Sequence, residues 1–499
     1  MNTPGLLSLR GRLGFLARDT AVYGVGEALI RALALITFPL LARHFSVADF
    51  GIIDFMTTCV LLLVVLLIFG QDSATARYFY ETEDRATRQQ VVSQSLAFEI
   101  GVMALVLPIG WVLAPAIADF LGLPAANGAL LVRLAILQAP FFVFVSLSLS
   151  LLKWTFKRWQ FLLMAVGTTV ATLAGLLITI FFFELDMVGV FTVYFVVRAM
   201  FALLGLWLVR EWLAFPTDSK QLRQLLPFAI SFGFISGITA LLPVLERGLV
   251  GNMVGNEALG LYAAGAKVAM LIALVINAIE TAWGPFSLAL HREENAVETY
   301  NHVLKGVCLL LFGAVLGLTA FSDAIVSLLG SARYTGAGSV TFPLCFALAA
   351  SAVGAITSIG IILSKRAHLK LYAYGVLLAV AAVAIPLGAS LYGIAGAAWG
   401  SAAAMLAKTF VETVLARRAY PLVWDYRAPL LLGGLAVAVG GIHQLTFGLL
   451  EVGGVSLLPL GGLVLLAAVA WFHLLDASER GHVLAMLRGL NKREADRTC

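Results

Sequence analysis

Charged residues are scarce in this chain of 499 residues. Asp, Glu, Lys and Arg together make up 12% of the sequence, about half the share found in soluble domains, whereas hydrophobic residues make up 61%. So few charges cannot cover a water-exposed surface, which excludes a soluble globular enzyme. The composition indicates an all-α integral membrane protein, because the alternating pattern of outer-membrane β-strands is absent.

Cysteines are few, and nucleotide-binding motifs are absent. The four cysteines lie in apolar runs or at the last residue, so the sequence predicts no disulfide framework and no metal site. No Gly-rich phosphate loop ending in Lys-Ser or Lys-Thr occurs. Every predicted loop is too short to hold a soluble domain. We therefore expect no catalytic residues, no cofactor, no ATP hydrolysis by this chain and no bound nucleic acid.

Long apolar segments, by contrast, are abundant. A helix needs about 20 apolar residues to cross roughly 30 Å of hydrocarbon. The sequence contains fourteen such segments: 20–43, 49–72, 92–116, 127–152, 160–183, 187–209, 225–247, 258–288, 303–322, 337–363, 370–390, 394–416, 428–449 and 455–475. We therefore expect about 14 transmembrane helices.

The basic residues predict an orientation for these helices. If the N-terminus is cytoplasmic, only Arg247 and Arg333 of the 33 Lys and Arg residues fall in segments on the opposite side, and six others lie within spans. This asymmetry follows the positive-inside rule at nearly every loop. We therefore expect both termini to be cytoplasmic.

A short internal repeat suggests two related halves. Residues 39–43 (Pro-Leu-Leu-Ala-Arg) end the first span, and residues 243–247 (Pro-Val-Leu-Glu-Arg) end the seventh. Two units of six spans in one orientation are a known transporter symmetry; the alternative is a chance match. The predicted parts are a cytoplasmic segment (1–19), an N-lobe (20–210), a cytoplasmic linker (211–224), a C-lobe (225–416), two further spans (417–476) and a cytoplasmic tail (477–499).

Six basic residues lie within predicted spans. Facing lipid at the midplane, each would cost about 2.5 to 3.5 kcal/mol, so they must form ion pairs, reach the interface or face water. Arg43 and Lys408 lie near span ends, from which long side chains reach the interface. The deeper ones are Arg31, Arg198, Lys267 and, about a third of the way in, Arg133. Because Arg and Lys bind phosphate well, these residues favour a wet cavity for an anionic substrate; structural ion pairs are the alternative.

Acidic residues also occur in the spans, namely Glu27, Asp54, Glu99, Glu280 and Glu412, with Asp72 at the inner end of the second span. Glu27 lies four residues before Arg31, and Glu412 four residues after Lys408, spacings at which helical side chains can pair. We assign Asp72 and Arg77 to the end of a helix. Glu280 has no basic neighbour in the sequence, so we expect it to titrate or to bind a cation.

Two stretches resemble a known family. Tyr23–Phe55 contains Pro-Leu-Leu-Ala-Arg, then Ser46, Asp-Phe-Gly at 49–51, and Asp54. Leu259–Ala264 (Leu-Gly-Leu-Tyr-Ala-Ala), followed by Lys267 and by Ala-Trp-Gly-Pro-Phe at 282–286, is similar to the family's eighth span. With these motifs the chain resembles the polysaccharide transporter family of the multidrug, oligosaccharidyl-lipid and polysaccharide exporter superfamily.

The resemblance implies two six-helix lobes around a central cavity plus two C-terminal helices. It further implies alternating access that flips an undecaprenyl-diphosphate-linked oligosaccharide across a bacterial inner membrane, among membrane lipids and glycan-assembly proteins. In this reading the basic residues hold the substrate, and coupling to H⁺ or Na⁺ falls to Glu280, Glu27 and Asp54. The alternatives are a drug or metabolite antiporter of the same superfamily, which should favour acidic cavity residues, and a glycan polymerase or ligase, which should need a large catalytic loop.

Overall fold

The chain is almost entirely helical. The computed structural model describes residues 36–123, 126–291, 293–364, 366, 368–446, 450–475 and 479–481. The strands in these ranges are β1 (Glu451–Val452) and β2 (Val455–Ser456), which form a short antiparallel hairpin. Twelve helices in the described part are long and apolar enough to cross a membrane. The expected all-α, multi-pass membrane protein is therefore confirmed.

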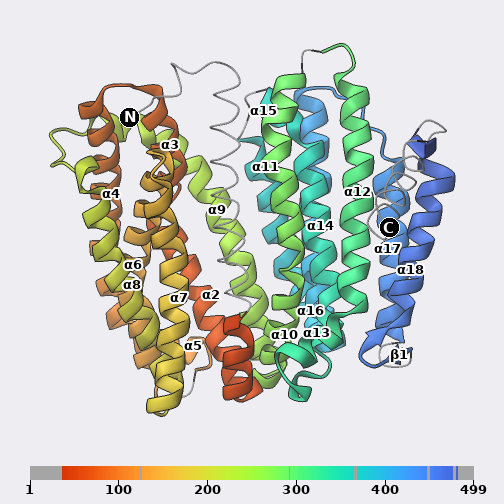
Figure 1. Cartoon of the computed structure of the whole chain (residues 1–499), viewed down its shortest axis with the longest axis horizontal. Helices are drawn as coiled ribbons and strands as arrows, with labels where there is room; N and C mark the ends of the chain where they lie inside the picture. The colour runs from red at the N-terminus through yellow and green to blue at the C-terminus, as the bar shows by residue number, and fades with distance from the viewer. Residues whose placement is uncertain are drawn as a thin grey trace, which may run out of the picture. The chain divides into compact units, whose positions relative to one another are not determined.

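The chain divides into two compact units, which are described separately below. The first contains the residues up to Ala263 together with Leu329–Arg333, and the second contains Ala264–Leu328 and the residues from Tyr334 onward. In Figure 1 the helices of the first unit are coloured from red to light green, and those of the second from green to blue. The limits predicted for the two lobes stay a prediction.

The first unit is a bundle of long helices. Its elements are α2 (Val47–Ile68), α3 (Gln71–Glu81), α4 (Arg85–Val112), α5 (Ala114–Phe120), α6 (Gly128–Trp154), α7 (Arg158–Phe182), α8 (Met187–Val209), the 3₁₀ turn η2 (Arg210–Trp212), α9 (Lys220–Met253) and the first part of α10 (Asn256–Ala269). Helices α2, α4 and α8 begin where Ser46, Asp84 and Asp186 each accept a hydrogen bond from the backbone N–H three residues later. Helices α6, α7 and α8 pack on one another around buried residues such as Phe161 and Met164.

A turn at Gly70 packs the start of α3 against α9. Helix α2 ends at Phe69, and the next residue, Gly70, has a φ of 75°, which glycine adopts at little cost. A Cβ atom on Gly70 would lie 2.3 Å from the carbonyl oxygen of Ala229 in α9. Because only glycine fits there, the turn approaches α9 backbone to backbone. It thereby fixes Gln71 and Asp72, the first residues of α3, next to α4 and α6.

The second unit contains the remaining helices. They are α11 (Ile272–Leu290), α12 (Ala296–Ala320), α13 (Ser322–Leu329), the 3₁₀ turn η4 (Ala337–Val340), α14 (Thr341–Thr357), α15 (Ile359–Leu363), α16 (Leu369–Ala419), α17 (Arg427–Leu445), α18 (Leu457–Val469) and the π-helical turn η5 (Ala470–Leu474). The last residue of α13 and most of the 3₁₀ turn η3 (Ala332–Tyr334) belong to the first unit. Helix α12 packs against α11, α14, α17 and α18. It is therefore the central element of this unit.

Helix α16 contains two spans. Its 51 residues would reach about 75 Å if straight, more than twice the thickness of a bilayer core. The backbone breaks at Tyr392 and Gly393, where Gly393 has a φ of 59°. Beyond the break the chain folds back, so that a Cβ atom on Gly396 would lie 2.0 Å from the carbonyl oxygen of Gly388. The small residues at 393–400 in the sequence predict such close helix contact, and the structure confirms it.

With α16 counted as two crossings, thirteen of the predicted spans have a helix in the described part of the chain. The remaining predicted span, 20–43, lies mostly outside the described residues. Two details of the prediction were wrong. The expected span 258–288 is divided between α10 and α11 at Met270 and Leu271, and α9 continues to Met253 instead of ending at Arg247.

Candidate functional site

The predicted site residues fall into three groups. Arg198, Arg133 and Asp54 belong to the first unit, whereas Lys267 and Glu280 belong to the second. Arg31 and Glu27 lie outside the described residues. The candidate residues of the first unit and those of the second unit are therefore treated as separate sites.

A buried ion pair joins α2 to α9. The Nε atom of Arg247 donates a hydrogen bond to Oδ2 of Asp54 over 2.6 Å, and the two side chains are only 5% and 3% exposed. Glu246 and Tyr262, both buried, lie within electrostatic reach of the same guanidinium. The placement of Arg247 in an outer loop was therefore wrong. Asp54 has a partner, and its predicted role in ion coupling stays a prediction.

Close backbone contact brings this ion pair into the interior. A Cβ atom on Gly260 would lie 1.9 Å from the carbonyl oxygen of Val47, so α10 touches the start of α2 with no side chain between them. Asp54 lies two turns farther along α2. The sequence did contain a signal for the burial of Arg247, because the residues that follow it, Gly-Leu-Val-Gly, continue the apolar helix.

Arg198 is held by neutral groups. It lies in the middle of α8, and its Nη1 atom donates a hydrogen bond to Oε1 of Gln138 on α6. The guanidinium carbon lies 4.4 Å from the ring centroid of Phe142 and 5.5 Å from that of Tyr194. Among the described residues no carboxylate forms an ion pair with Arg198. Cation–π contacts orient an arginine but leave its positive charge in place, so this guanidinium can attract an anion.

Tyr194 connects Arg198 to the buried ion pair. The charges of Arg198 and of Asp54 both act on the Tyr194 hydroxyl, which lies on α8 one turn before Arg198. Two of the residues chosen from the sequence, one on α2 and one on α8, thus lie in one region of the first unit. Of these two, Asp54 forms an ion pair within the described residues, since Arg247 neutralises it.

Arg133 lies near an end of its helix. It is the sixth residue of α6, and its guanidinium carbon lies 5.5 Å from the ring centroid of Trp111 on α4. Tryptophan is enriched at membrane interfaces. These contacts are typical of an arginine that reaches toward the edge of the bilayer, and its predicted role in substrate binding stays a prediction.

Lys267 and Glu280 lie in the second unit. Lys267 is half-buried in the last turn of α10. The basic groups whose charges act on Glu280, on α11, are Lys408 and Lys370 of α16. Glu280 therefore has basic neighbours that the sequence alone did not reveal. The predicted roles of Lys267 and Glu280 stay predictions.

A buried ion-pair network lies beside Glu280. Glu412, 2% exposed, forms ion pairs with Lys408 over 3.1 Å and with Lys370 over 3.3 Å. Lys408 also donates to Oγ of Ser351 over 3.0 Å. The pairing of Lys408 with Glu412 predicted from their spacing is confirmed. The expectation that Lys408 reaches the membrane interface was wrong, because its side chain is only 5% exposed.

Sequence comparison places this architecture in a family. A family model described as "Polysaccharide biosynthesis protein" matches residues 16–291. The chain belongs to this polysaccharide biosynthesis protein family. An uncharacterized membrane protein of Haemophilus influenzae, to which the chain is similar, is 25% identical over 280 residues, or 54% of this chain. The chain spans 65% of the length of that relative.

Solved structures show the same fold as this member of the polysaccharide biosynthesis protein family. The chain is similar to the lipid II flippase MurJ in an inward closed conformation, with 13% identity, a TM-score of 0.70, and coverage of 90% of this chain and 99% of MurJ. It is also similar to an inward-facing MATE multidrug resistance transporter of the MOP superfamily, with 14% identity, a TM-score of 0.57, and coverage of 77% and 93%. The resemblance stated from the sequence motifs is thus confirmed for family and fold.

Proposed function

We propose that this chain flips a lipid-linked oligosaccharide with a diphosphate linkage from the cytoplasmic to the outer leaflet of a bacterial inner membrane by alternating access. Membership of the polysaccharide biosynthesis protein family supports a glycan substrate. The likeness in fold to a lipid II flippase supports a lipid-linked one. The predicted orientation, with both termini cytoplasmic, belongs to this proposal, as do glycan-assembly proteins as partners.

The observation that carries the proposal is the guanidinium of Arg198, which forms no ion pair with a carboxylate of the described residues. It lies midway along a membrane-spanning helix, and its partners are an amide and two aromatic rings. A cation at such a depth is costly unless it serves a ligand or faces water. Arginine is well suited to phosphate, because its planar donors match two phosphate oxygens. Arg198 is therefore the residue proposed to hold the diphosphate, with Lys267, Arg133 and Arg31 as further substrate contacts.

Coupling to a proton or sodium gradient is the second part of the proposal. Glu280, Glu27 and Asp54 are the residues assigned to it. For Asp54 to bind an ion, its carboxylate must first leave Arg247, so its contribution requires a conformational change in the first unit. Glu280 needs no such release, because its basic neighbours are already paired with Glu412.

The test uses Arg198→Ala and Arg198→Lys in a strain that depends on this gene for its surface glycan. Loss of a charge-assisted hydrogen bond is worth about 1.5 to 3 kcal/mol, so Arg198→Ala should reduce export roughly 10- to 100-fold. The lipid-linked precursor should accumulate in the membrane, and Arg198→Lys should retain part of the export. Immunoblotting of membranes verifies equal amounts of protein.

Arg210→Ala is the matched control. Arg210 follows α8 directly and is exposed, and its guanidinium carbon lies 4.7 Å from the ring centroid of Trp207. Its loss should leave export unchanged. Normal export by Arg198→Ala would contradict the proposed anion site. Unchanged glycan together with lost drug resistance would favour the antiporter of the same superfamily.

A further inference from the structure

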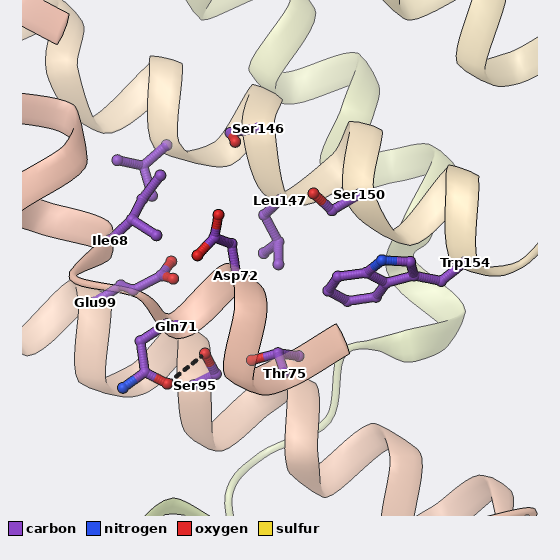
Figure 2. Close-up of a pocket in the computed structure, with 11 residues that line it drawn as sticks. Ile68, Gln71, Asp72, Thr75, Ser95, Glu99, Ser146, Leu147, Ser150 and Trp154 are labelled. Carbon is purple, nitrogen blue, oxygen red and sulfur yellow. Dashed lines mark hydrogen bonds between the residues drawn. The ribbon is translucent and has the colours of Figure 1, made fainter. Parts of the chain in front are cut away.

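A small pocket lined by both polar and apolar side chains lies in the first unit, apart from Arg198 and the Asp54–Arg247 pair. Its walls come from the end of α2 and from α3, α4 and α6, and Figure 2 shows the polar side chains that surround it. The cavity volume is about 10 Å³, close to what one water-sized occupant requires. The pocket is therefore too small for a sugar or a diphosphate.

Buried polar atoms at this pocket lack partners. Gln71 is 0% exposed, Thr75 is 1% exposed and Glu99 is 4% exposed. Within the described part of the chain, Nε2 of Gln71, Oγ1 of Thr75 and Oε2 of Glu99 make no hydrogen bond. Each such atom costs about 1 to 3 kcal/mol when it is left unsatisfied. The two oxygen atoms, Oγ1 of Thr75 and Oε2 of Glu99, can face a cation at this cavity, whereas Nε2 of Gln71 is a donor and cannot.

The charge at the pocket is negative. The carboxyl groups of Asp72 on α3 and Glu99 on α4 point toward one another in Figure 2, and the charge of Asp72 acts on Glu99. Lining residues from α2 and α6 carry no charge. Two ionised carboxylates at close range are unfavourable unless a cation lies between them or one takes up a proton.

Basic residues on the same helices are engaged elsewhere. Arg77 of α3 forms an ion pair with Glu81 over 3.0 Å. Arg88 of α4 donates to the carbonyl oxygen of Thr82. Lys153 of α6 lies 5.3 Å from the ring centroid of Phe161. None of the three is among the residues that line the pocket.

We propose that Asp72 and Glu99, with the hydroxyl of Thr75, form a binding site for one small monovalent cation, beside which the side chain of Gln71 lies. Oxygen ligands suit hard cations. A sodium ion fits the volume of the cavity and the negative charge, and a proton bound to one carboxylate also satisfies the charge. Ser95 supports the site, because its hydroxyl donates to Oε1 of Gln71 over 3.0 Å and holds that side chain in place. Binding of the cation is independent of the proposed flippase activity, whereas any role in driving transport rests on it.

Thermal unfolding of the purified full-length protein tests the site. In 100 mM sodium chloride the wild type should unfold roughly 3 °C or more above its value in choline chloride, because a ligand that binds only the folded state stabilises it. Asp72→Asn and Thr75→Val should weaken the response to sodium. Glu99→Gln should abolish it, while its neutral amide keeps the folded state intact. Glu81→Gln is the matched control, since Glu81 lies on the same helix but is paired with Arg77 at the surface.

A pH series in choline chloride separates the two cations. If the proton is the occupant, lowering the pH from 8 to 5 should stabilise the wild type more than Glu99→Gln, and sodium should have no specific effect. The proposal is overturned if wild type and Glu99→Gln respond alike to both sodium and pH. Export of glycan by Arg198→Ala is scored separately, so failure of the flippase proposal and failure of this site give different results.

Discussion

The burial of the Asp54–Arg247 ion pair leads to a prediction about the free energy of unfolding. In Asp54→Asn the guanidinium of Arg247 stays buried without its hydrogen-bonded carboxylate, and Glu246 is the carboxylate left within electrostatic reach. Two unit charges about 4 Å apart interact by about 4 kcal/mol at an effective dielectric constant near 20. Removal of one partner from a buried pair typically costs about 3 to 5 kcal/mol. The burial of both side chains, 5% and 3% exposed, places this pair in that class.

The assay is thermal unfolding of the purified protein in detergent, followed by tryptophan fluorescence. At roughly 1 to 2 °C per kcal/mol for a chain of this length, Asp54→Asn should lower the unfolding temperature by about 3 to 10 °C. The double variant Asp54→Asn/Arg247→Met should recover most of this loss, because an apolar side chain of similar length no longer buries a charge.

Glu81→Gln provides the surface comparison. It breaks an ion pair whose side chains are about half exposed, and such pairs contribute less than about 1 kcal/mol. Its unfolding temperature should therefore stay within about 2 °C of the wild type. If Asp54→Asn behaves like Glu81→Gln, or if the double variant is no more stable than Asp54→Asn, the argument from burial is refuted.

Two further predictions concern backbone contacts, and a third concerns a titrating group. Gly70→Ala should reduce the yield of folded protein, because φ is 75° and the added Cβ meets α9, whereas Gly101→Ala, with open space around it, should be neutral or slightly stabilising. Gly396→Val should separate the two halves of α16 and likewise lower the yield measured by size-exclusion chromatography. Burial and the nearby charge of Glu451 raise the pKa of Asp323 from 3.8 to about 6. The folded state therefore binds the proton more tightly than the unfolded state, and stability should fall by about 1 to 2 kcal/mol as pH rises from about 4 through about 6. Asp323→Asn should remove this part of the pH dependence in unfolding measurements from pH 4 to 7.

Features that depend on local sequence could be predicted well. Apolar length alone located the spans, because a helix must satisfy its own backbone in the membrane. The spacing of four residues predicted the Lys408–Glu412 pair, and the small residues at 393–400 predicted the close packing within α16. Each of these features involves residues adjacent on one helix or one helical hairpin.

Features that depend on distant partners could not be predicted. Asp54 and Arg247 are 193 residues apart, so the sequence offered no reason to pair them. The division between α10 and α11 falls at Met270 and Leu271, where neither glycine nor proline marks it. The Gly-Pro pair at 284–285 should weaken the backbone ladder of a helix, yet α11 runs through it. Tertiary packing, which is not visible in a local pattern, decides these positions.

Helix α6 links the two sites proposed for the first unit. Gln138 on this helix accepts from Arg198, and Ser146, two turns later, lines the pocket of Asp72 and Glu99. The separation of eight residues corresponds to about 12 Å along the helix. A displacement of α6 that accompanies cation binding would therefore move the hydrogen-bond acceptor of Arg198. Because coupling between two binding sites is reciprocal, a cation that favours anion binding must itself bind more tightly when the anion is present. Replacement of Gln138 by Leu should weaken that coupling while leaving the sodium response of the Asp72 and Glu99 pocket in place.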